Sequence, residues 1–129
     1  MPETEVCFYR ENDGTVPVLD WLWRLRCQDR KAFANCVALI RRLAMFGYEL
    51  RRPQVDYLRD GIYELRAKSG HVNYRVLYFF CGQNVALLAH GLTKEAKVPE
   101  SDIDCAVARK RRYEQDPERH TAQEDFGYD

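Results

Sequence analysis

The residues of this sequence that can do chemistry gather in three short stretches, Ile62–Ala67, Val72–Cys81 and Val85–Leu92. Each stretch is rich in β-branched and aromatic residues, and Gly- or Asn-containing breaks separate them, which predicts three consecutive antiparallel strands. Because side chains alternate between the two faces of a strand, the pairing decides which of them meet. Pairing through tight turns places seven polar side chains on one face: Glu64, Arg66, Lys68, Asn73, Arg75, His90 and Lys94.

The predicted register sets Glu64 opposite Arg75 in the first hairpin and Arg75 opposite His90 in the second. A one-residue shift at the second turn would move His90 to the other face. That other face is predicted to be apolar and to lie under helices: Tyr63, Leu65, Val72, Tyr74, Val76, Tyr78, Phe80, Val85 and Leu87. The polar face is predicted to have an apolar end that needs a cover: Ile62, Leu77, Phe79 and Leu88.

The four cations of the polar face form a predicted phosphate-binding surface, because guanidinium groups bind phosphate in a bidentate manner. Such contacts position a nucleic acid without reading its sequence. Metal-free RNA cleavage needs a base for the 2′-hydroxyl, a cation for the pentavalent phosphate and an acid for the 5′-oxygen. Either Glu64 or His90 can move the protons, and Arg75 can stabilise the charge.

Each of these features also has a purely structural interpretation. A basic strand face is often only a solvated face. Glu64 and Arg75 can form an ordinary cross-strand ion pair, and a histidine on a strand is often a hydrogen-bonded structural residue. The basic run Arg109–Arg112 is either a solvated helix end, where cations favour the helix dipole, or a further RNA contact.

Composition limits the remaining possibilities. The chain has 129 residues, 46% of them apolar and 31% charged, as expected for one globular domain. It contains no apolar run of membrane-spanning length and no signal-peptide pattern, so we expect a cytoplasmic protein without a membrane partner. The five cysteines are scattered and form no C-x-x-C pair, and carboxylates do not cluster, so no metal, disulfide framework or cofactor is expected.

The surrounding sequence predicts the elements that position the polar face. A first strand is expected at Val6–Glu11, followed by a helix from Pro17 and a second helix that Asp29 caps and Gly47 ends. A short strand is expected at Val55–Leu58. A third helix opens at Pro99 and ends with the basic run before Tyr113.

Charge is distributed unevenly along the chain. Residues 113–129 hold six acidic residues and one basic residue, a net charge of −5, so the rest of this formally neutral chain carries +5. We therefore predict one domain over residues 1–113 and an acidic, disordered tail over residues 114–129, with His120 solvated. The tail is a candidate screen for the basic face.

Several segments together resemble the RelE/HigB superfamily of toxins, and more narrowly its phage-derived HigB-like branch. The resemblance covers the chain from the first strand to Tyr113 in the same element order. It is carried by Gly61-Ile62-Tyr63-Glu64-Leu65-Arg66, Tyr74-Arg75-Val76-Leu77-Tyr78-Phe79-Phe80, His90-Gly91-Leu92-Thr93-Lys94 and the Pro99-led helix that ends Ala108-Arg109-Lys110-Arg111-Arg112-Tyr113.

The resemblance implies an α+β fold, in which an antiparallel sheet of about four strands is backed by an N-terminal helical hairpin and followed by a C-terminal helix. It implies a type II toxin–antitoxin toxin that cleaves mRNA on the ribosome, with a helix-turn-helix antitoxin as partner. An antitoxin segment would cover the apolar end of the polar face. The alternative is a ParE-type toxin that acts on a protein target such as gyrase.

The implied site residues follow from the same resemblance. Arg75 matches the arginine that stabilises the phosphate in RelE-like enzymes, and Arg66 matches a basic position on the preceding strand. The tyrosine that those enzymes carry near the start of the last helix has no counterpart here, which leaves His90 or Glu64 for proton transfer. The predicted RNA contacts are Lys68, Asn73, Lys94, Lys97, Arg111 and Arg112.

Overall fold

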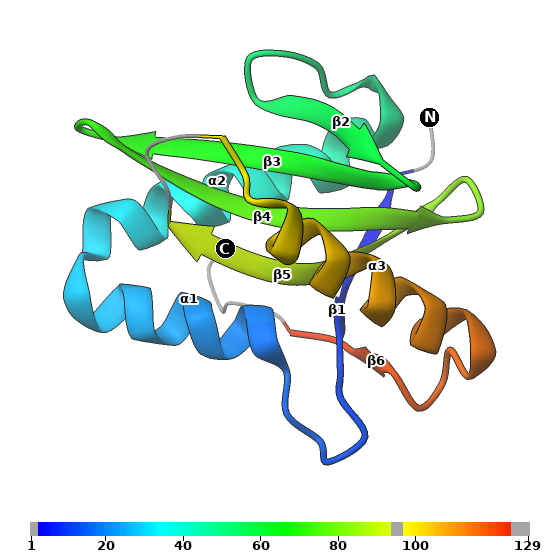
Figure 1. Ribbon diagram of the computed structural model, residues 1–129. Helices are drawn as coiled ribbons and strands as arrows, with labels where there is room; N and C mark the ends of the chain where they lie inside the picture. Colours follow the sequence, from blue (N-terminus) through cyan, green and yellow to red (C-terminus); the bar gives the residue numbers. More distant parts are fainter. Residues whose placement is uncertain (1–2, 94–96, 125–129) are drawn as a thin grey trace.

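A six-stranded sheet lies between a helical hairpin and a single helix in the computed structural model (Figure 1). The structure describes residues 3–93 and 97–124. The helices are α1 (Pro17–Gln28), α2 (Arg30–Phe46), the short 3-10 helix η1 (Gly47–Glu49) and α3 (Glu100–Gln115). The strands are β1 (Glu5–Tyr9), β2 (Val55–Arg59), β3 (Ile62–Ser69), β4 (Val72–Cys81), β5 (Val85–Thr93) and β6 (Thr121–Ala122). No helix in the described part is both long and apolar enough to cross a bilayer.

Local sequence signals set the limits of the helical hairpin. Pro17 begins α1, as predicted, because its fixed φ suits the first turn. The Asp29 side chain caps α2 by accepting a hydrogen bond from the backbone N–H of Ala32 at 3.1 Å. Gly47 ends α2 with φ of +52°, a conformation that favours glycine. Helix α2 packs on the aromatic face of β3, and α1 packs beside it on the same side of the sheet, against β5.

The sheet is larger than predicted and is not purely antiparallel. Its strand order is β2-β3-β4-β5-β1-β6, and β1 runs parallel to β5. The prediction of an antiparallel sheet of about four strands is therefore wrong. β1 pairs along the outer edge of β5, which would otherwise present unpaired backbone groups to solvent.

The first hairpin has a tighter turn than predicted. Arg66 lies opposite Arg75, and Glu64 lies opposite Leu77 rather than opposite Arg75. The predicted pairing is shifted by two residues, because the strands continue through Ser69 and Val72. A two-residue shift keeps every side chain on its face, since side chains alternate with a period of two. The predicted faces of β3 and β4 are therefore confirmed.

The second hairpin differs from the prediction at its turn, but a bulge further along returns His90 to its predicted face. Cys81 pairs with Val85 instead of Asn84, a one-residue shift that exchanges the faces of Leu87 and Leu88. A bulge then follows, since Leu88 pairs with Tyr78 whereas His90 pairs with Leu77. The extra residue, Ala89, adds a second one-residue shift in the same direction, so Arg75 pairs with Leu92 rather than with His90, the predicted partner. The total shift of two residues returns the side chains to their predicted faces. His90 thus lies on the same face as Arg75, as predicted. The cause is a bulge that the strand pattern did not predict.

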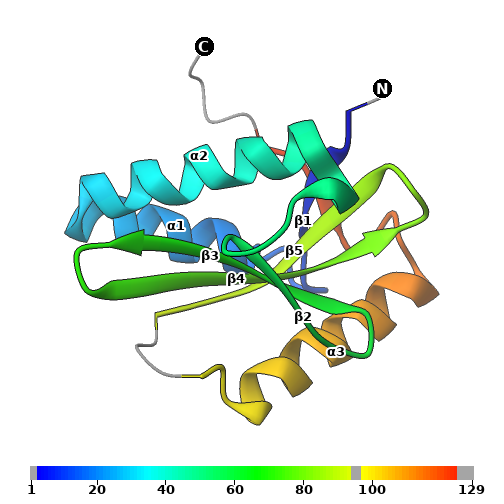
Figure 2. The ribbon, with the colours of Figure 1, turned by 90° about the horizontal axis from the view of Figure 1, so that it is seen from above.

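Helix α3 covers the face that was expected to remain open. Figure 2 shows α2 on one side of the sheet and α3 on the other. The apolar edge of α3, formed by Ile103, Ala106 and Val107, packs on Ile62, Leu77, Phe79 and Leu87 in a second core. The expectation that an antitoxin segment covers this end is therefore corrected: the chain covers it with its own helix.

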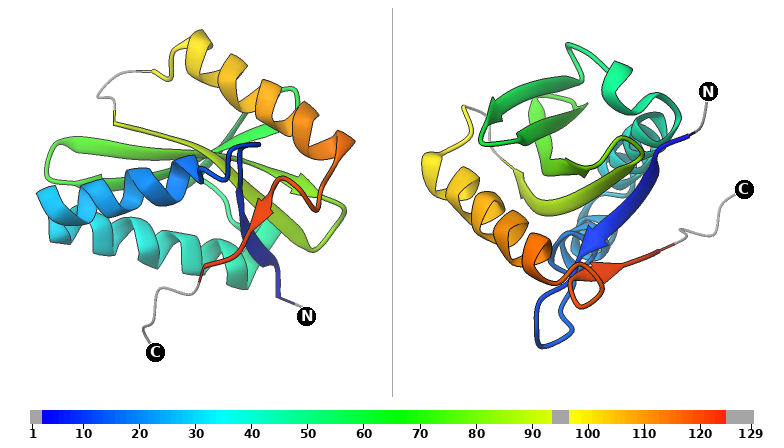
Figure 3. Two further views of the ribbon diagram at one scale, coloured as in Figure 1. Left: turned by 90° about the horizontal axis from the view of Figure 1, so that it is seen from below. Right: turned by 90° about the vertical axis from the view of Figure 1, so that its right-hand side faces the viewer.

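The expected disordered tail is ordered as far as residue 124. Helix α3 continues to Gln115, and β6 pairs with β1 in an antiparallel manner at the edge of the sheet (Figure 3). His120 is buried rather than solvated, because its ring stacks on Tyr9 and its Nδ1 lies 2.8 Å from the carbonyl oxygen of Arg10. The tail prediction is wrong for residues 114–124, and residues 125–129 lie outside the described residues.

Candidate functional site

Two arginines and one glutamate form a bridged cluster in the middle of the polar face. Arg66 and Arg75 are directly opposite on β3 and β4, a pairing of like charges that is unfavourable by itself. The Glu64 carboxylate compensates, because it accepts hydrogen bonds from Arg75 Nη1 and, at 3.2 Å, from Arg66 Nε. Glu64 and Arg75 are buried, whereas the Arg66 side chain is 30% exposed. The ion pair between Glu64 and Arg75, one of the two interpretations of the sequence, is present.

A second acidic group extends this cluster onto β2. Asp56 accepts from Arg66 Nη2 at 3.0 Å and from Arg52 Nε. Burial opposes ionisation of Asp56, but the hydrogen bonds from Arg52 and Arg66 outweigh it and lower the pKa of the carboxyl group. At Arg66, the hydrogen bond that the guanidinium donates to Glu64 likewise outweighs burial and raises the pKa of the guanidinium. Both groups are therefore charged at neutral pH.

These side chains line a pocket of about 620 Å³ between β2, β3 and the start of α3, which we call the arginine pocket. Five basic and three acidic residues line it, so it has an excess of positive charge: Arg52, Arg59, Arg66, Arg75 and Lys97 against Asp56, Glu64 and Glu100. Arg59 forms ion pairs with Glu100 and Asp104 and so links this pocket to α3. Guanidinium groups in such a setting can bind a phosphodiester.

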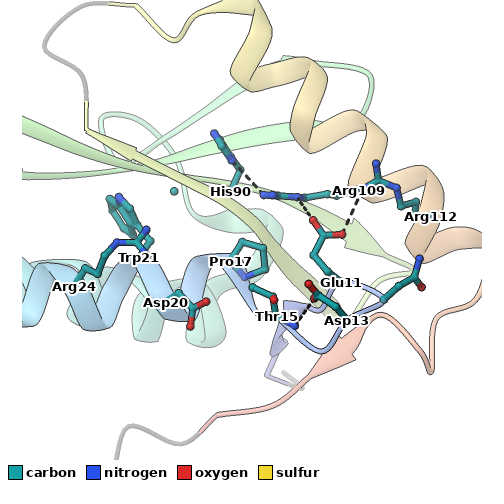
Figure 4. Close-up of a pocket in the computed structure, with 12 residues that line it drawn as sticks. Glu11, Asp13, Thr15, Pro17, Asp20, Trp21, Arg24, His90, Arg109 and Arg112 are labelled. Atoms are coloured by element: carbon teal, nitrogen blue, oxygen red, sulfur yellow. Dashed lines mark hydrogen bonds and ion pairs between the residues drawn. The ribbon is translucent and has the colours of Figure 1, made fainter.

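His90 lies in a different pocket, of about 790 Å³, which we call the histidine pocket (Figure 4). Its Nε2 is 2.7 Å from Asp102 Oδ1, and its Nδ1 is 3.2 Å from Arg109 Nη1. Arg109 also donates to the carbonyl oxygen of Ala89 at 2.7 Å and to Glu11 at 3.3 Å. The bulge residue, α3 and the loop after β1 thus hold the imidazole in place.

The surroundings of His90 act on its pKa in opposite directions. Burial lowers the pKa of His90, and hydrogen bonds with Cys105 and Asp102 raise it. The charge of Arg109 opposes protonation, but the net shift of the pKa is upward. The hydrogen bond with His90 lowers the pKa of the Cys105 thiol.

The predicted site residues divide between the two pockets. Arg66, Arg75, Glu64 and Lys97 line the arginine pocket and His90 lines the histidine pocket; the two share no lining residue. Arg66, Arg75 and His90 lie on one face of the sheet, as predicted, but they do not form the single site for RNA cleavage that was predicted from that face. The separation arises because α3 packs across this face.

The predicted RNA contacts are also spread out. Lys68 and Asn73 are directly opposite near the tip of the first hairpin. Arg112 lines the histidine pocket, where its guanidinium lies 3.5 Å from Glu11, and Arg111 is exposed beside it on α3. The rise of an α-helix places Arg112 roughly 18 Å along the axis from Glu100, far from the arginine pocket. Lys94 lies outside the described residues.

Sequence reasoning missed the groups that complete each pocket. Arg52 and Asp56 are four residues apart, a weak local signal, but only the pairing of β2 with β3 brings them to Arg66. Asp102 falls within the predicted third helix and Glu11 at the end of the predicted first strand, but neither position indicated a contact with His90 or Arg109. No group of three His, Cys, Asp or Glu side chains in the described part of the chain could hold a metal ion.

The fold and the arginine pocket define a small α+β protein with a cationic pocket on one face of its sheet. The family model of the phage-derived Gp49-like proteins (DUF891) matches residues 23–111, and the chain belongs to this family. The family is associated with toxins of toxin–antitoxin systems. None of the curated proteins compared with this sequence matches it.

Proposed function

We propose that this protein is the toxin of a type II toxin–antitoxin system and cleaves mRNA on the ribosome without a metal ion. The observation that carries the proposal is the pair of opposed guanidinium groups, Arg66 and Arg75, that line one pocket with an excess of positive charge. Glu64 bridges the two guanidinium groups, but five cations against three carboxylates leave the pocket a net positive charge, which a bound phosphodiester would offset. Membership of the Gp49-like family supports the assignment to a toxin–antitoxin system.

In this reaction the 2′-oxygen of one nucleotide forms a bond to the adjacent phosphorus, and the bond from phosphorus to the 5′-oxygen breaks. The 2′-hydroxyl loses a proton to water, the 5′-oxygen gains one from water, and a cyclic phosphate remains. Negative charge develops on the phosphoryl oxygens, where Arg66 and Arg75 stabilise it. Lys97, which lines the same pocket, binds the neighbouring backbone.

Glu64 acts in this proposal as a positioning residue. Its carboxylate already accepts hydrogen bonds from both arginines, so its lone pairs are directed at guanidinium groups rather than at a substrate hydroxyl. His90 has no part in the step, because it lines the other pocket between Asp102 and Arg109. Cleavage then relies mainly on electrostatic stabilisation, commonly the largest single catalytic contribution.

The direct test is translation of a defined mRNA in a cell-free extract, with the 5′ ends of the products mapped. We expect cuts within the coding region, cyclic phosphate on the upstream fragment and no cleavage when ribosomes are removed. Addition of EDTA to an assay on purified stalled ribosomes supplied with polyamines should leave cleavage intact if no metal takes part in the step. Intact mRNA together with inhibited DNA gyrase would replace this proposal with a ParE-type activity.

A cognate antitoxin is the second expected partner, and a cytoplasmic location follows from a ribosomal substrate. We propose a small helix-turn-helix protein, encoded beside the toxin, that binds over the arginine pocket. Co-expression of the neighbouring reading frame should restore growth of cells that produce the toxin. If growth stays arrested although both proteins are soluble, that neighbour is not the antitoxin.

A further inference from the structure

A third pocket, of about 620 Å³, lies between α2 and β3, and we call it the α2–β3 pocket. Four apolar residues contribute to its wall: Ala38 and Leu39 from α2, Pro53 from the loop before β2 and Ala67 from β3. An apolar wall of this kind suits a flat, weakly polar group such as a nucleobase.

The charged residues of this pocket are all cations. Arg42 and Lys68 line it together with Arg66, and no acidic residue does so. Arg42 lies over the ring of Phe46 at 5.2 Å, and neither Arg42 nor Lys68 forms an ion pair with any of the described residues. Their charge is therefore available to an anionic ligand.

Three amide side chains complete the lining: Asn35, Gln54 and Asn73. The Asn35 Nδ2 donates to the carbonyl oxygen of Lys68 at 3.1 Å, which fixes that amide and leaves its oxygen as an acceptor. An amide offers a donor and an acceptor side by side, which is the pattern that a base edge presents. Apolar contact, amides and cations together fit one nucleotide of an unpaired strand.

The α2–β3 pocket and the arginine pocket open at the same edge of the sheet. Arg66 lines both pockets. β2 pairs with β3 only as far as Leu65, so β2 does not cover the next part of β3. Figure 2, which views this edge, shows α2 on one side and α3 on the other with the edge strands between them. A polynucleotide crossing this edge would pass from one pocket to the other.

From this arrangement we propose that the α2–β3 pocket binds the nucleobase next to the phosphodiester held in the arginine pocket, and so sets the base preference of cleavage at that position. The inference rests on the proposed function, because the arginine pocket must first hold RNA. Gln54 and Asn73 contact the base edge, and Arg42 and Lys68 bind the adjoining phosphate. The ligand is single-stranded RNA, since a base within a duplex cannot enter a pocket.

The test is to sequence all cut ends that the toxin produces in a cell-free translation extract and to derive the base preference at each position around the cut. Wild-type protein should show a preference at a position adjoining the cleaved bond. In the double variant Gln54→Ala/Asn73→Ala that preference should disappear, while the preference at other positions persists. Arg42→Ala should reduce total cleavage about fivefold to tenfold and leave the preference unchanged.

Arg30→Ala is the matched control, because it removes an exposed cation from α2 outside this pocket and should behave as wild type. Thermal melting shows whether the variants are folded; if the double variant is not, Gln54→Ala, altered at a partly exposed side chain, replaces it. An unchanged base preference in a folded variant overturns the inference but leaves the proposed function standing. Intact mRNA with wild-type protein overturns the proposed function itself. Loss of antitoxin binding with an unchanged base preference would identify a protein-docking surface instead.

Discussion

The arginine pocket and the histidine pocket both border α3, but their charges are arranged differently. In the arginine pocket, five cations meet three carboxylates, and two of the cations are forced opposite each other on paired strands. In the histidine pocket, three arginines meet three carboxylates, and the imidazole is held between Asp102 and Arg109. The arginine pocket therefore has an excess of positive charge that can bind an anion, whereas the arginines and carboxylates of the histidine pocket balance one another.

This difference shows how a single helix divides a polar surface. The first turns of α3 border the arginine pocket, and its last turns carry Arg109 and Arg112 into the histidine pocket. Residues that share a strand face can therefore belong to separate sites. The predictions below test whether cleavage depends on the arginine pocket alone.

The largest effect is expected from Arg75→Ala. Cleavage should fall at least about 100- to 1000-fold, because charge stabilisation at the phosphoryl group is lost. The free energy of unfolding should also fall by roughly 3–5 kcal/mol, since Glu64 remains buried without this partner. Mapping of mRNA ends and urea denaturation measure the two losses.

The double variant Arg75→Ala/Glu64→Gln separates the two roles of Arg75. It removes the uncompensated charge, so part of the stability should return while cleavage stays undetectable. A return of cleavage in this variant would show that Arg75 acts only through stability.

Arg66→Ala is expected to lower cleavage about 100-fold, with a loss of stability of at most about 1 kcal/mol because its ion pairs are partly exposed. Arg24→Ala is the matched control, since Arg24 is an exposed arginine that lines the histidine pocket. It should cleave as wild type in the same end-mapping assay. Equal losses in both variants would mean that only overall charge matters.

Gly91→Ala should alter the histidine pocket and spare the arginine pocket. A Cβ at this position would lie 2.5 Å from Cδ2 of Trp21, so either the indole or β5 must move. Crowding of this kind costs roughly 1–3 kcal/mol of unfolding free energy, and the added variant Trp21→Ala should return part of it by removing the clash. Cleavage by folded Gly91→Ala protein should be unchanged, and a specific loss would assign the histidine pocket a role in the reaction.

The smallest effect is a pH dependence that His90 produces. Because the pKa of His90 is raised in the folded protein, its contribution to stability is complete below the unfolded pKa of about 6.5 and is lost as pH rises through the folded pKa. The stability difference between wild type and His90→Gln should therefore be greater at acidic than at alkaline pH. His71→Gln, which alters an exposed histidine at a turn, should show no such trend. Denaturation curves of both variants, measured from below the unfolded pKa to above the folded pKa, test this prediction. Parallel trends for the two variants would contradict the assignment of the pH dependence to His90.

Local patterns predicted much of the fold correctly. The start of α1 at Pro17, the Asp29 cap and the Gly47 end depend on the chemistry of single residues and were confirmed. The faces of β3 and β4 were also correct despite a wrong register, because a two-residue error preserves alternation. The grouping of Glu64, Arg66 and Arg75 followed from this alternation, and it is the part of the candidate site that the sequence alone could supply.

Other features depended on distant parts of the chain. Strand β5 pairs in parallel with β1, which lies some eighty residues earlier, and no local sequence pattern predicts such a pairing. The ordered tail was missed because acidic composition favours disorder, while the stacking of His120 on Tyr9 depends on the completed fold. The same holds for Asp56, which reaches Arg66 only through the β2–β3 pairing.

The sequence by itself determined which side chains of β3 and β4 share a face and where the helical hairpin begins, turns and ends, because those properties depend on neighbours a few residues away. Only the tertiary structure decided that Ala89 forms a bulge, that α3 covers the apolar end of the polar face and that His90 is separated from Arg75. Burial of the apolar edge of α3 against the sheet separates His90 from Arg75, and such burial depends on contacts between distant parts of the chain.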